Sequence, residues 1–183
     1  MSFSSQSSGT NGSDITDGQL NVDLHSDGVV GHYIDRIQFQ EAGDTTLTGT
    51  GTSNTYSSAA ITLELQILAI DYNDAFEFYP GTNVLFGTWT LPPPKTGLTW
   101  NGSLTLDVTA YLESLGYSGR ATWVSIQSDN VLATASEVGT SAFIDKKAEG
   151  LSITAITVPE PGSLSLLVLG GALLLVTRFG RKN

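Results

Sequence analysis

The chain has 183 residues, which suits one domain with a short appendage, and only 14% of them are charged, against about 25% in typical soluble domains. Eight Lys and Arg face 18 Asp and Glu, and the resulting net charge of −10 disfavours a nucleic-acid partner. The chain has no cysteine and two histidines, which excludes disulfides, thiolate metal sites and cysteine nucleophiles and disfavours most enzymes.

The N-terminal segment, residues 1–18, is rich in Ser and Gly. Such a composition offers little apolar surface to bury on folding. The sequence therefore predicts a disordered lead before the first strand.

Residues 19–157 contain short runs in which apolar and polar side chains alternate. This period of two, with turn residues between the runs, predicts an all-β domain, a single jelly-roll-like β-sandwich. The clearest core strand spans 60–70, whereas the polar stretch 41–58 is expected to be a connection with at most one short strand. The other predicted strands span 19–24, 33–40, 75–79, 84–90, 103–108, 121–127, 141–144 and 151–157. The alternation predicts burial of Leu63, Leu65, Ile67, Leu104, Leu106, Trp123, Leu151 and Ile153.

Proline and capping residues divide these runs. Pro80-Gly81 is expected to split 75–79 from 84–90, and a further break is expected at Pro92-Pro93-Pro94. The only helix predicted in the body spans 109–115, with Asp107 or Thr109 as its N-cap and with Leu112 and Leu115 turned inward.

The stretch around this cap, LTLDVTAYL at 104–112, resembles the strand-to-helix segment of secreted DNRLRE-type β-sandwiches, a family similar to carbohydrate-binding modules. The resemblance implies a β-sandwich with carbohydrate-binding relatives. The leading Asp-Asn-Arg-Leu-Arg stretch of that family is not present in the chain.

The C-terminal segment, 158–183, differs in composition from the body. It begins with Val-Pro-Glu-Pro-Gly at 158–162, continues with the uncharged apolar run 163–177, and ends with the basic residues of 178–183. A helix over 163–177 would be about 22 Å long, shorter than the ~30 Å hydrocarbon core of a bilayer. Because the run is apolar on all sides and is followed by Arg178, Arg181 and Lys182, it predicts a short transmembrane helix with a cytoplasmic stop. A buried C-terminal helix is the alternative.

The order Pro159-Glu160-Pro161, short apolar helix and terminal basic cluster resembles the PEP-CTERM sorting signal of Gram-negative bacteria. The resemblance implies export, retention in the inner membrane by a single C-terminal helix, and processing near the motif by exosortase in species that make exopolysaccharide. The protein is then expected at the cell surface or outside the cell. Residues 1–20 have no basic and apolar leader, so we expect an export signal to be encoded upstream of Met1.

Candidate site residues in the body are few. Trp100 and Trp89 are candidates for stacking on sugar rings, although Trp100 is equally suited to fastening the Pro-rich connection onto the sandwich. His25 and His32 lack the spacing of a metal site and are expected to be surface residues. Neither a catalytic group nor a cofactor is predicted; a structural Ca²⁺ on the Asp-rich turns at 71–74 or 14–27 is an open alternative. The carboxylates that a glycosidase would have to pair are Glu64, Glu77, Asp107 and Glu113.

Three classes of function remain after these exclusions. The sequence favours an exported, non-enzymatic protein of the cell surface or extracellular matrix, sorted through its tail and associated with exopolysaccharide. A membrane-anchored carbohydrate-binding module is the alternative, and a secreted glycan hydrolase is the third hypothesis.

Overall fold

The computed structural model describes residues 2–9, 11–29, 31–147 and 152–157. The predicted tail, with Pro159, Glu160, Pro161, Arg178, Arg181 and Lys182, lies outside these residues, and so does Leu151. Within the described part of the chain, no helix is long and apolar enough to cross a membrane.

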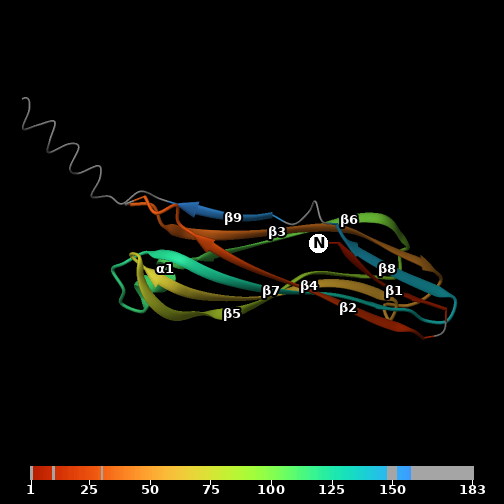
Figure 1. Ribbon diagram of the computed structural model, residues 1–183. Helices are drawn as coiled ribbons and strands as arrows, with labels where there is room; N and C mark the ends of the chain where they lie inside the picture. Colours follow the sequence, from red (N-terminus) through yellow and green to blue (C-terminus); the bar gives the residue numbers. More distant parts are fainter. Residues whose placement is uncertain (1, 10, 30, 148–151, 158–183) are drawn as a thin grey trace, which may run out of the picture.

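The part of the chain that the structure describes is all-β, with one short helix among its strands (Figure 1). In chain order the elements are β1 (Phe3–Ser8), β2 (Ser13–His25), β3 (Ile34–Gly49), β4 (Tyr56–Ile70), β5 (Asn73–Thr90), β6 (Lys95–Asp107), α1 (Val108–Ser114), β7 (Ala121–Ala135), β8 (Thr140–Lys146) and β9 (Ser152–Thr157).

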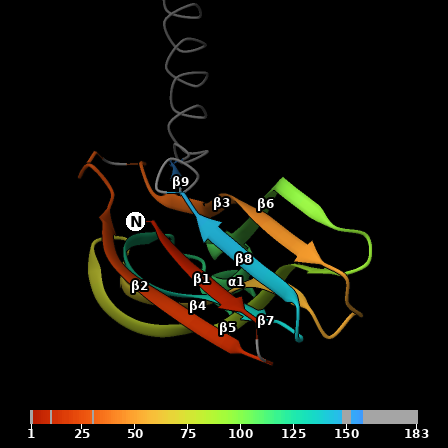
Figure 2. The same cartoon turned by 90° about the vertical axis from the view of Figure 1, so that its right-hand side faces the viewer.

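The strands lie in two layers (Figure 1). One layer has the order β1-β8-β3-β6, and Figure 2 shows β1, β8 and β3 side by side. The other layer has the order β2-β7-β4-β5, and all of its pairs are antiparallel. These two orders, 1-8-3-6 and 2-7-4-5, are those of a jelly roll. β9 is an addition that pairs with the first half of β3.

The core forms where the inward faces of the two layers meet. It contains Ile37 and Phe39 of β3, Leu106 of β6 and the apolar row of β4, all buried. Leu63, Leu65, Ile67 and Leu106 are buried as predicted, and Leu104 is partly buried against this cluster.

Trp123 differs from the prediction. It is half-buried on the outer face of β7, because its neighbours Val124 and Ile126 occupy the inward positions.

The N-terminal segment is a second correction, because residues expected to form a disordered lead form β1 and the start of β2. Phe3, Ser5 and Ser7 occupy the inward positions of β1, and the two serines, which are buried, are too small and polar to show as a strand pattern. Ser5 Oγ lies 3.0 Å from Thr134 Oγ1 of β7, so hydroxyl pairing takes the place of apolar packing.

The polar stretch 41–58 is likewise a strand for much of its length. β3 continues to Gly49, with Glu41, Thr45 and Leu47 buried on the inward side. Glu41 is neutralised by Lys146, whose Nζ lies 2.5 Å from Glu41 Oε1, with the side chains 2% and 1% exposed. Burial raises the pKa of Glu41, and the contact with Lys146 opposes that rise.

The expected division at Pro80-Gly81 is absent, and β5 is one strand with register shifts against β4. β5 lies at the edge of its layer, where a proline without an N–H is tolerated. The break at Pro92-Pro93-Pro94 is confirmed, since β5 ends at Thr90 and β6 begins at Lys95.

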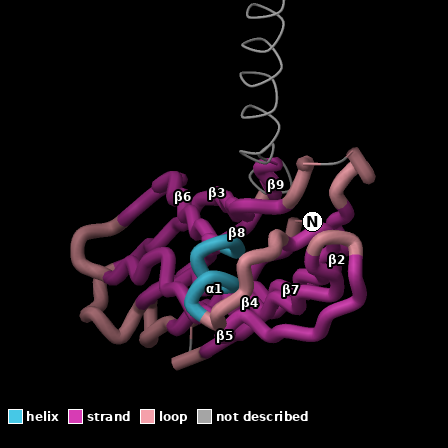
Figure 3. Tube along the Cα trace, turned by 90° about the vertical axis from the view of Figure 1, so that its left-hand side faces the viewer, coloured by secondary structure: helices cyan, strands magenta, loops and turns pink. Residues whose placement is uncertain are grey.

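Helix α1 closes one end of the sandwich (Figure 3). Asp107 is its N-cap, and its Oδ1 accepts a hydrogen bond of 2.8 Å from Ala110 N. This contact, with help from Arg36, lowers the pKa of Asp107 although partial burial opposes it. Leu112 is buried as predicted, whereas Leu115 is 46% exposed because the helix ends at Ser114.

Candidate functional site

The most distinctive surface feature is a hollow of about 320 Å³ on the outer face of β2, β7 and β4. A second hollow of about 100 Å³ adjoins it and shares Glu64 and Gln127 with it. Together they form one continuous depression, which we call the polar groove. Its principal side chains are Asn21 and Asp23 from β2, Ser125 and Gln127 from β7, and Glu64 and Gln66 from β4.

The strand register brings these residues together in rows across the sheet. Asn21 pairs with Gln127, and Gln127 pairs with Glu64. The next row contains Asp23, Ser125 and Gln66, and the row on the other side contains Gln19, Asp129 and Thr62. Neighbouring strands are about 4.8 Å apart, so three strands supply donors and acceptors over roughly 10 Å. The groove is thus a field of amide, carboxylate and hydroxyl groups.

Several of these groups retain hydrogen-bonding capacity. Asn21, Asp23, Glu64 and Gln127 are exposed. Asp129 Oδ1 is shielded from solvent and has no hydrogen-bond partner among the described residues. Carboxylates accept and amides both donate and accept, which suits a ligand that carries many hydroxyl groups.

Aromatic side chains lie beyond one end of the groove. His25 of β2 stacks on Trp123 of β7, with ring centroids 4.7 Å apart and planes inclined by 25°. Phe78 of β5 pairs in register with Gln66, and its ring meets that of Phe76 edge-on at 4.9 Å. Phe76 and Phe78 are 65% and 51% exposed, so this end of the layer presents apolar ring surface beside the polar groove.

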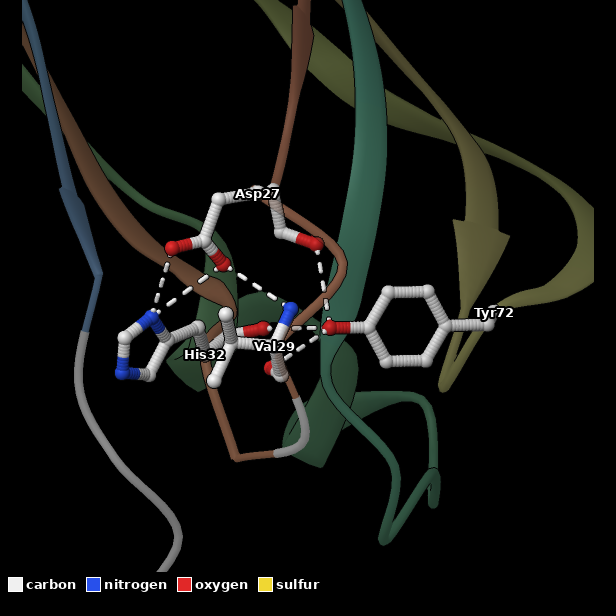
Figure 4. A network of polar contacts seen from close by, with 5 residues as sticks. Asp27, Val29, His32 and Tyr72 are labelled. Atoms are coloured by element: carbon white, nitrogen blue, oxygen red, sulfur yellow. Dashed lines mark hydrogen bonds and ion pairs between the residues drawn. The ribbon is translucent and has the colours of Figure 1, made fainter.

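The loop that follows His25 is held by a network of polar contacts (Figure 4). The carboxylate of Asp27 accepts hydrogen bonds from His32 Nδ1 at 2.9 Å and from Val29 N at 3.0 Å, and both contacts lower the pKa of Asp27. The Tyr72 hydroxyl lies 2.9 Å from the carbonyl oxygen of Val29 and 3.1 Å from that of His32. The network connects the β2–β3 loop to the turn that precedes β5.

Trp100 is not a surface platform, since it is 4% exposed and faces the interior. Its ring covers Gly43, whose backbone leaves room for it, and its Nε1 donates a 3.2 Å hydrogen bond to the carbonyl oxygen of Asp145. Trp100 contacts β3, β5 and β8, so it holds the start of β6 onto the sandwich.

Trp89 is also turned inward. It pairs in register with Ser57, which is fully buried, and its ring lies 6.1 Å from that of Trp100. Both candidate tryptophans therefore belong to the interior, whereas Trp123, which the sequence assigned to the core, lies on the outer face.

The four carboxylates considered for catalysis are dispersed. Asp107 caps α1, Glu113 pairs with Arg120 at 3.1 Å, and Glu77 accepts a 2.5 Å hydrogen bond from the Tyr117 hydroxyl, which raises the pKa of Tyr117. Only Glu64 lies in the groove, where Asp23 and Asp129 accompany it.

The Asp-rich turns serve the backbone. Asp71 Oδ1 accepts a hydrogen bond from Arg120 N, and its carbonyl oxygen accepts one from Asn73. Among the described residues, no three His, Asp or Glu side chains converge as metal ligands.

Sequence reasoning missed most of the groove, although a signal was present. Polar residues occupy successive outward positions of three strands: 19, 21 and 23 in β2, 62, 64 and 66 in β4, and 125, 127 and 129 in β7. Their alternation with apolar residues shows that they share a face, but the order of the strands decides that they are neighbours.

No family model matches the chain, and no curated protein matches it. Among solved structures, one of carbohydrate-binding modules from the β-sandwich superfamily aligns at 12% identity and a TM-score of 0.25, over 84% of this chain and 56% of that one. The VP2 protein of infectious bursal disease virus aligns at 12% identity and a TM-score of 0.13, over 96% and 48%. The chain thus spans about half the length of these structures, and likenesses this slight carry no argument about its ligand.

Proposed function

We propose that this chain is an exported, non-enzymatic carbohydrate-binding domain that is sorted through its C-terminal tail and binds extracellular polysaccharide in the polar groove. The observation that carries the proposal is the groove itself, a hollow in which three adjacent strands present amide and carboxylate side chains. A glycan offers closely spaced hydroxyl groups that both donate and accept, and these side chains match them.

The aromatic end adds a second element of a glycan site. Ligand pockets combine apolar and aromatic walls with a few polar groups that fix orientation. The His25–Trp123 stack and Phe78 lie on the same outer face as the amides of the groove. A sugar chain that crosses the strands in the row of Asp23, Ser125 and Gln66 ends at Phe78, and the His25–Trp123 stack lies in the neighbouring row.

The environment of the carboxylates supports binding rather than catalysis. Glycosidases work with a carboxylic acid held in a desolvated environment opposite a second carboxylate. Asp23 and Glu64 are exposed, and Asp129 is the groove carboxylate with one oxygen shielded from solvent. Glu77, Asp107 and Glu113 are engaged with Tyr117, Arg36 and Arg120.

The sorting part of the proposal rests on the sequence of 158–183. Pro159-Glu160-Pro161, the apolar run 163–177 and the basic end with Arg178, Arg181 and Lys182 stand in the order of a PEP-CTERM signal. Exosortase is then the processing partner, and the cell surface or extracellular matrix is the destination. Mass spectrometry of the protein from its native host tests this: a mature C-terminus close to Pro161 supports sorting, and an intact end at Asn183 on the outer surface contradicts it.

Affinity electrophoresis of the full chain in gels containing soluble polysaccharides, including dextran and the exopolysaccharide of the host, tests the binding. We expect retardation by at least one glycan, and its loss in the variant Gln127→Ala. The matched control is Gln40→Ala, since Gln40 is an exposed glutamine on the outer face of the other layer. If both variants are retarded equally, the groove is not the binding site. If the protein releases reducing ends from the glycan, it is a hydrolase and not only a binding protein.

A further inference from the structure

Charge is distributed unequally between the two layers of the sandwich. The strands of the layer β2-β7-β4-β5 contain no Lys or Arg. The same strands contain seven carboxylates, Asp14, Asp17, Asp23, Glu64, Asp74, Glu77 and Asp129.

The cations of the described chain all lie elsewhere and are all engaged. Arg36 contacts Asp107, and Arg120 contacts Glu113 and the ring of Tyr33. Lys146 is buried against Glu41, and Lys147 is paired with Asp44. Lys95 Nζ donates to the carbonyl oxygens of Thr90 and Pro93. No cation among the described residues is placed to offset the carboxylates of the groove.

The carboxylates of the groove come from three different strands. Asp23 lies on β2, Glu64 on β4 and Asp129 on β7, so negative charge extends across the width of the groove rather than at one point. The neutral side chains between them, Asn21 and Gln127, pair with each other in register. A bound chain therefore meets a carboxylate wherever it lies in the groove.

This pattern discriminates between classes of glycan. A uronate or sulfated chain would place like charge within a few ångströms of Asp23, Glu64 and Asp129, and repulsion at such distances is only partly screened by salt. A chain with protonated amino groups would instead form charge-assisted hydrogen bonds, which are shorter and stronger than those between neutral groups.

We infer that the polar groove selects polysaccharides that carry free amino groups and rejects anionic ones. This inference rests on the proposed carbohydrate-binding function and specifies the ligand class for the same site. The carboxylates recognise the amines, and the amides of Asn21 and Gln127 bind the hydroxyl groups between them.

The test compares short oligosaccharides binding to the full chain in solution, with a chelator present. Glucosamine oligomers and N-acetylglucosamine oligomers share one backbone and differ in charge, and galacturonate oligomers supply the anionic class. We expect the glucosamine oligomers to bind most tightly, the N-acetylated ones more weakly and the galacturonates not at all. Raising the salt concentration should narrow the difference between the first two.

Variants that remove single carboxylates test whether the preference for amino groups comes from the groove. Glu64→Gln and Asp129→Asn preserve shape, and both should leave binding of the N-acetylated oligomers nearly unchanged. Glu64→Gln should weaken glucosamine binding by about two- to fivefold, as expected of an exposed charge pair. Asp129→Asn should weaken it at least as much, because Asp129 Oδ1 is shielded from solvent. Glu113→Gln is the matched control, because it removes one exposed carboxylate from α1, outside the groove.

The outcomes separate the inference from the function it rests on. If galacturonate oligomers bind as tightly as glucosamine oligomers, the inference is overturned and the carbohydrate-binding proposal stands. The same conclusion follows if galacturonate oligomers bind only after Ca²⁺ replaces the chelator, because the groove would then accept an anionic glycan. Equal weakening by Glu113→Gln and Glu64→Gln would overturn it as well, since attraction would then come from net charge alone. Failure of every glycan, including neutral polymers, would overturn the proposed function.

Discussion

The two layers of the sandwich differ in where they place their polar groups. In the layer β1-β8-β3-β6, inward polar side chains form buried pairs, such as Glu41 with Lys146 and Thr45 with Ser57 of the facing layer at 2.6 Å. In the layer β2-β7-β4-β5 the groove residues are turned outward and remain available. The buried polar pairs of the first layer stabilise the fold, and we propose that the outward polar side chains of the second layer bind a ligand.

The largest loss of stability is expected when the buried pair Glu41–Lys146 is disrupted. Lys146→Ala leaves Glu41 buried without its partner, and we expect a loss of about 3–5 kcal/mol in the free energy of unfolding, measured by urea denaturation. The double variant Glu41→Leu, Lys146→Met removes both charges and should recover most of that loss. A single variant as stable as the wild type would show that the pair is not buried as described.

The tryptophan of the interior should affect stability and not binding. Trp100→Phe removes the hydrogen bond to the carbonyl oxygen of Asp145 and part of the ring that covers Gly43. We expect a loss of about 1–3 kcal/mol in unfolding free energy, with glycan affinity unchanged. If the folded variant binds glycan more weakly, Trp100 contributes to the binding site.

Trp123, on the outer face, should affect glycan binding more than stability. Trp123→Ala removes the ring that stacks on His25 beside the groove. We expect about a tenfold loss of glycan affinity, as for one lost stacking contact, measured by titration calorimetry. Phe76→Ala is a control for general loss of exposed apolar surface, because Phe76 is more exposed and does not line the groove. Equal losses from both changes would argue against a specific stack.

The smallest effect concerns the cap of α1, and it depends on pH. Because the pKa of Asp107 is lowered in the folded state, its ionised form adds stability above the unfolded pKa, and that stability is lost as the pH falls through the folded value, below 3.8. Asp107→Asn keeps a capping acceptor and loses the charge beside Arg36. We expect the variant to be less stable than the wild type by up to about 1 kcal/mol at neutral pH, and the difference to vanish in acid. A pH-independent difference would mean that charge plays no part in the cap.

The groove shows why the candidate site was found only in part. Glu64 was a candidate because it is an outward carboxylate in a clear strand, and it does line the groove. Asn21 and Gln127 show no such signal, because they are separated by more than a hundred positions along the chain and meet only through the pairing of β2 with β7. The aromatic candidates failed because a tryptophan's exposure depends on the face that its strand turns outward, and short apolar runs around Trp123 leave that choice ambiguous.

Features that depend on near neighbours along the chain can be predicted from the sequence alone. Period-two alternation marked the core strand around Leu63 and Leu65, and the Asp-Val-Thr order at 107–109 marked the cap and the helix. Long-range contacts, in contrast, place Ser5 and Ser7 in a strand, bury Trp100 over Gly43 and set which strands lie side by side. Alternation reports which face of a strand is buried. Strand pairing, however, joins residues far apart in the chain, and its energy comes from backbone hydrogen bonds and inter-layer packing, which leave no local sequence signature.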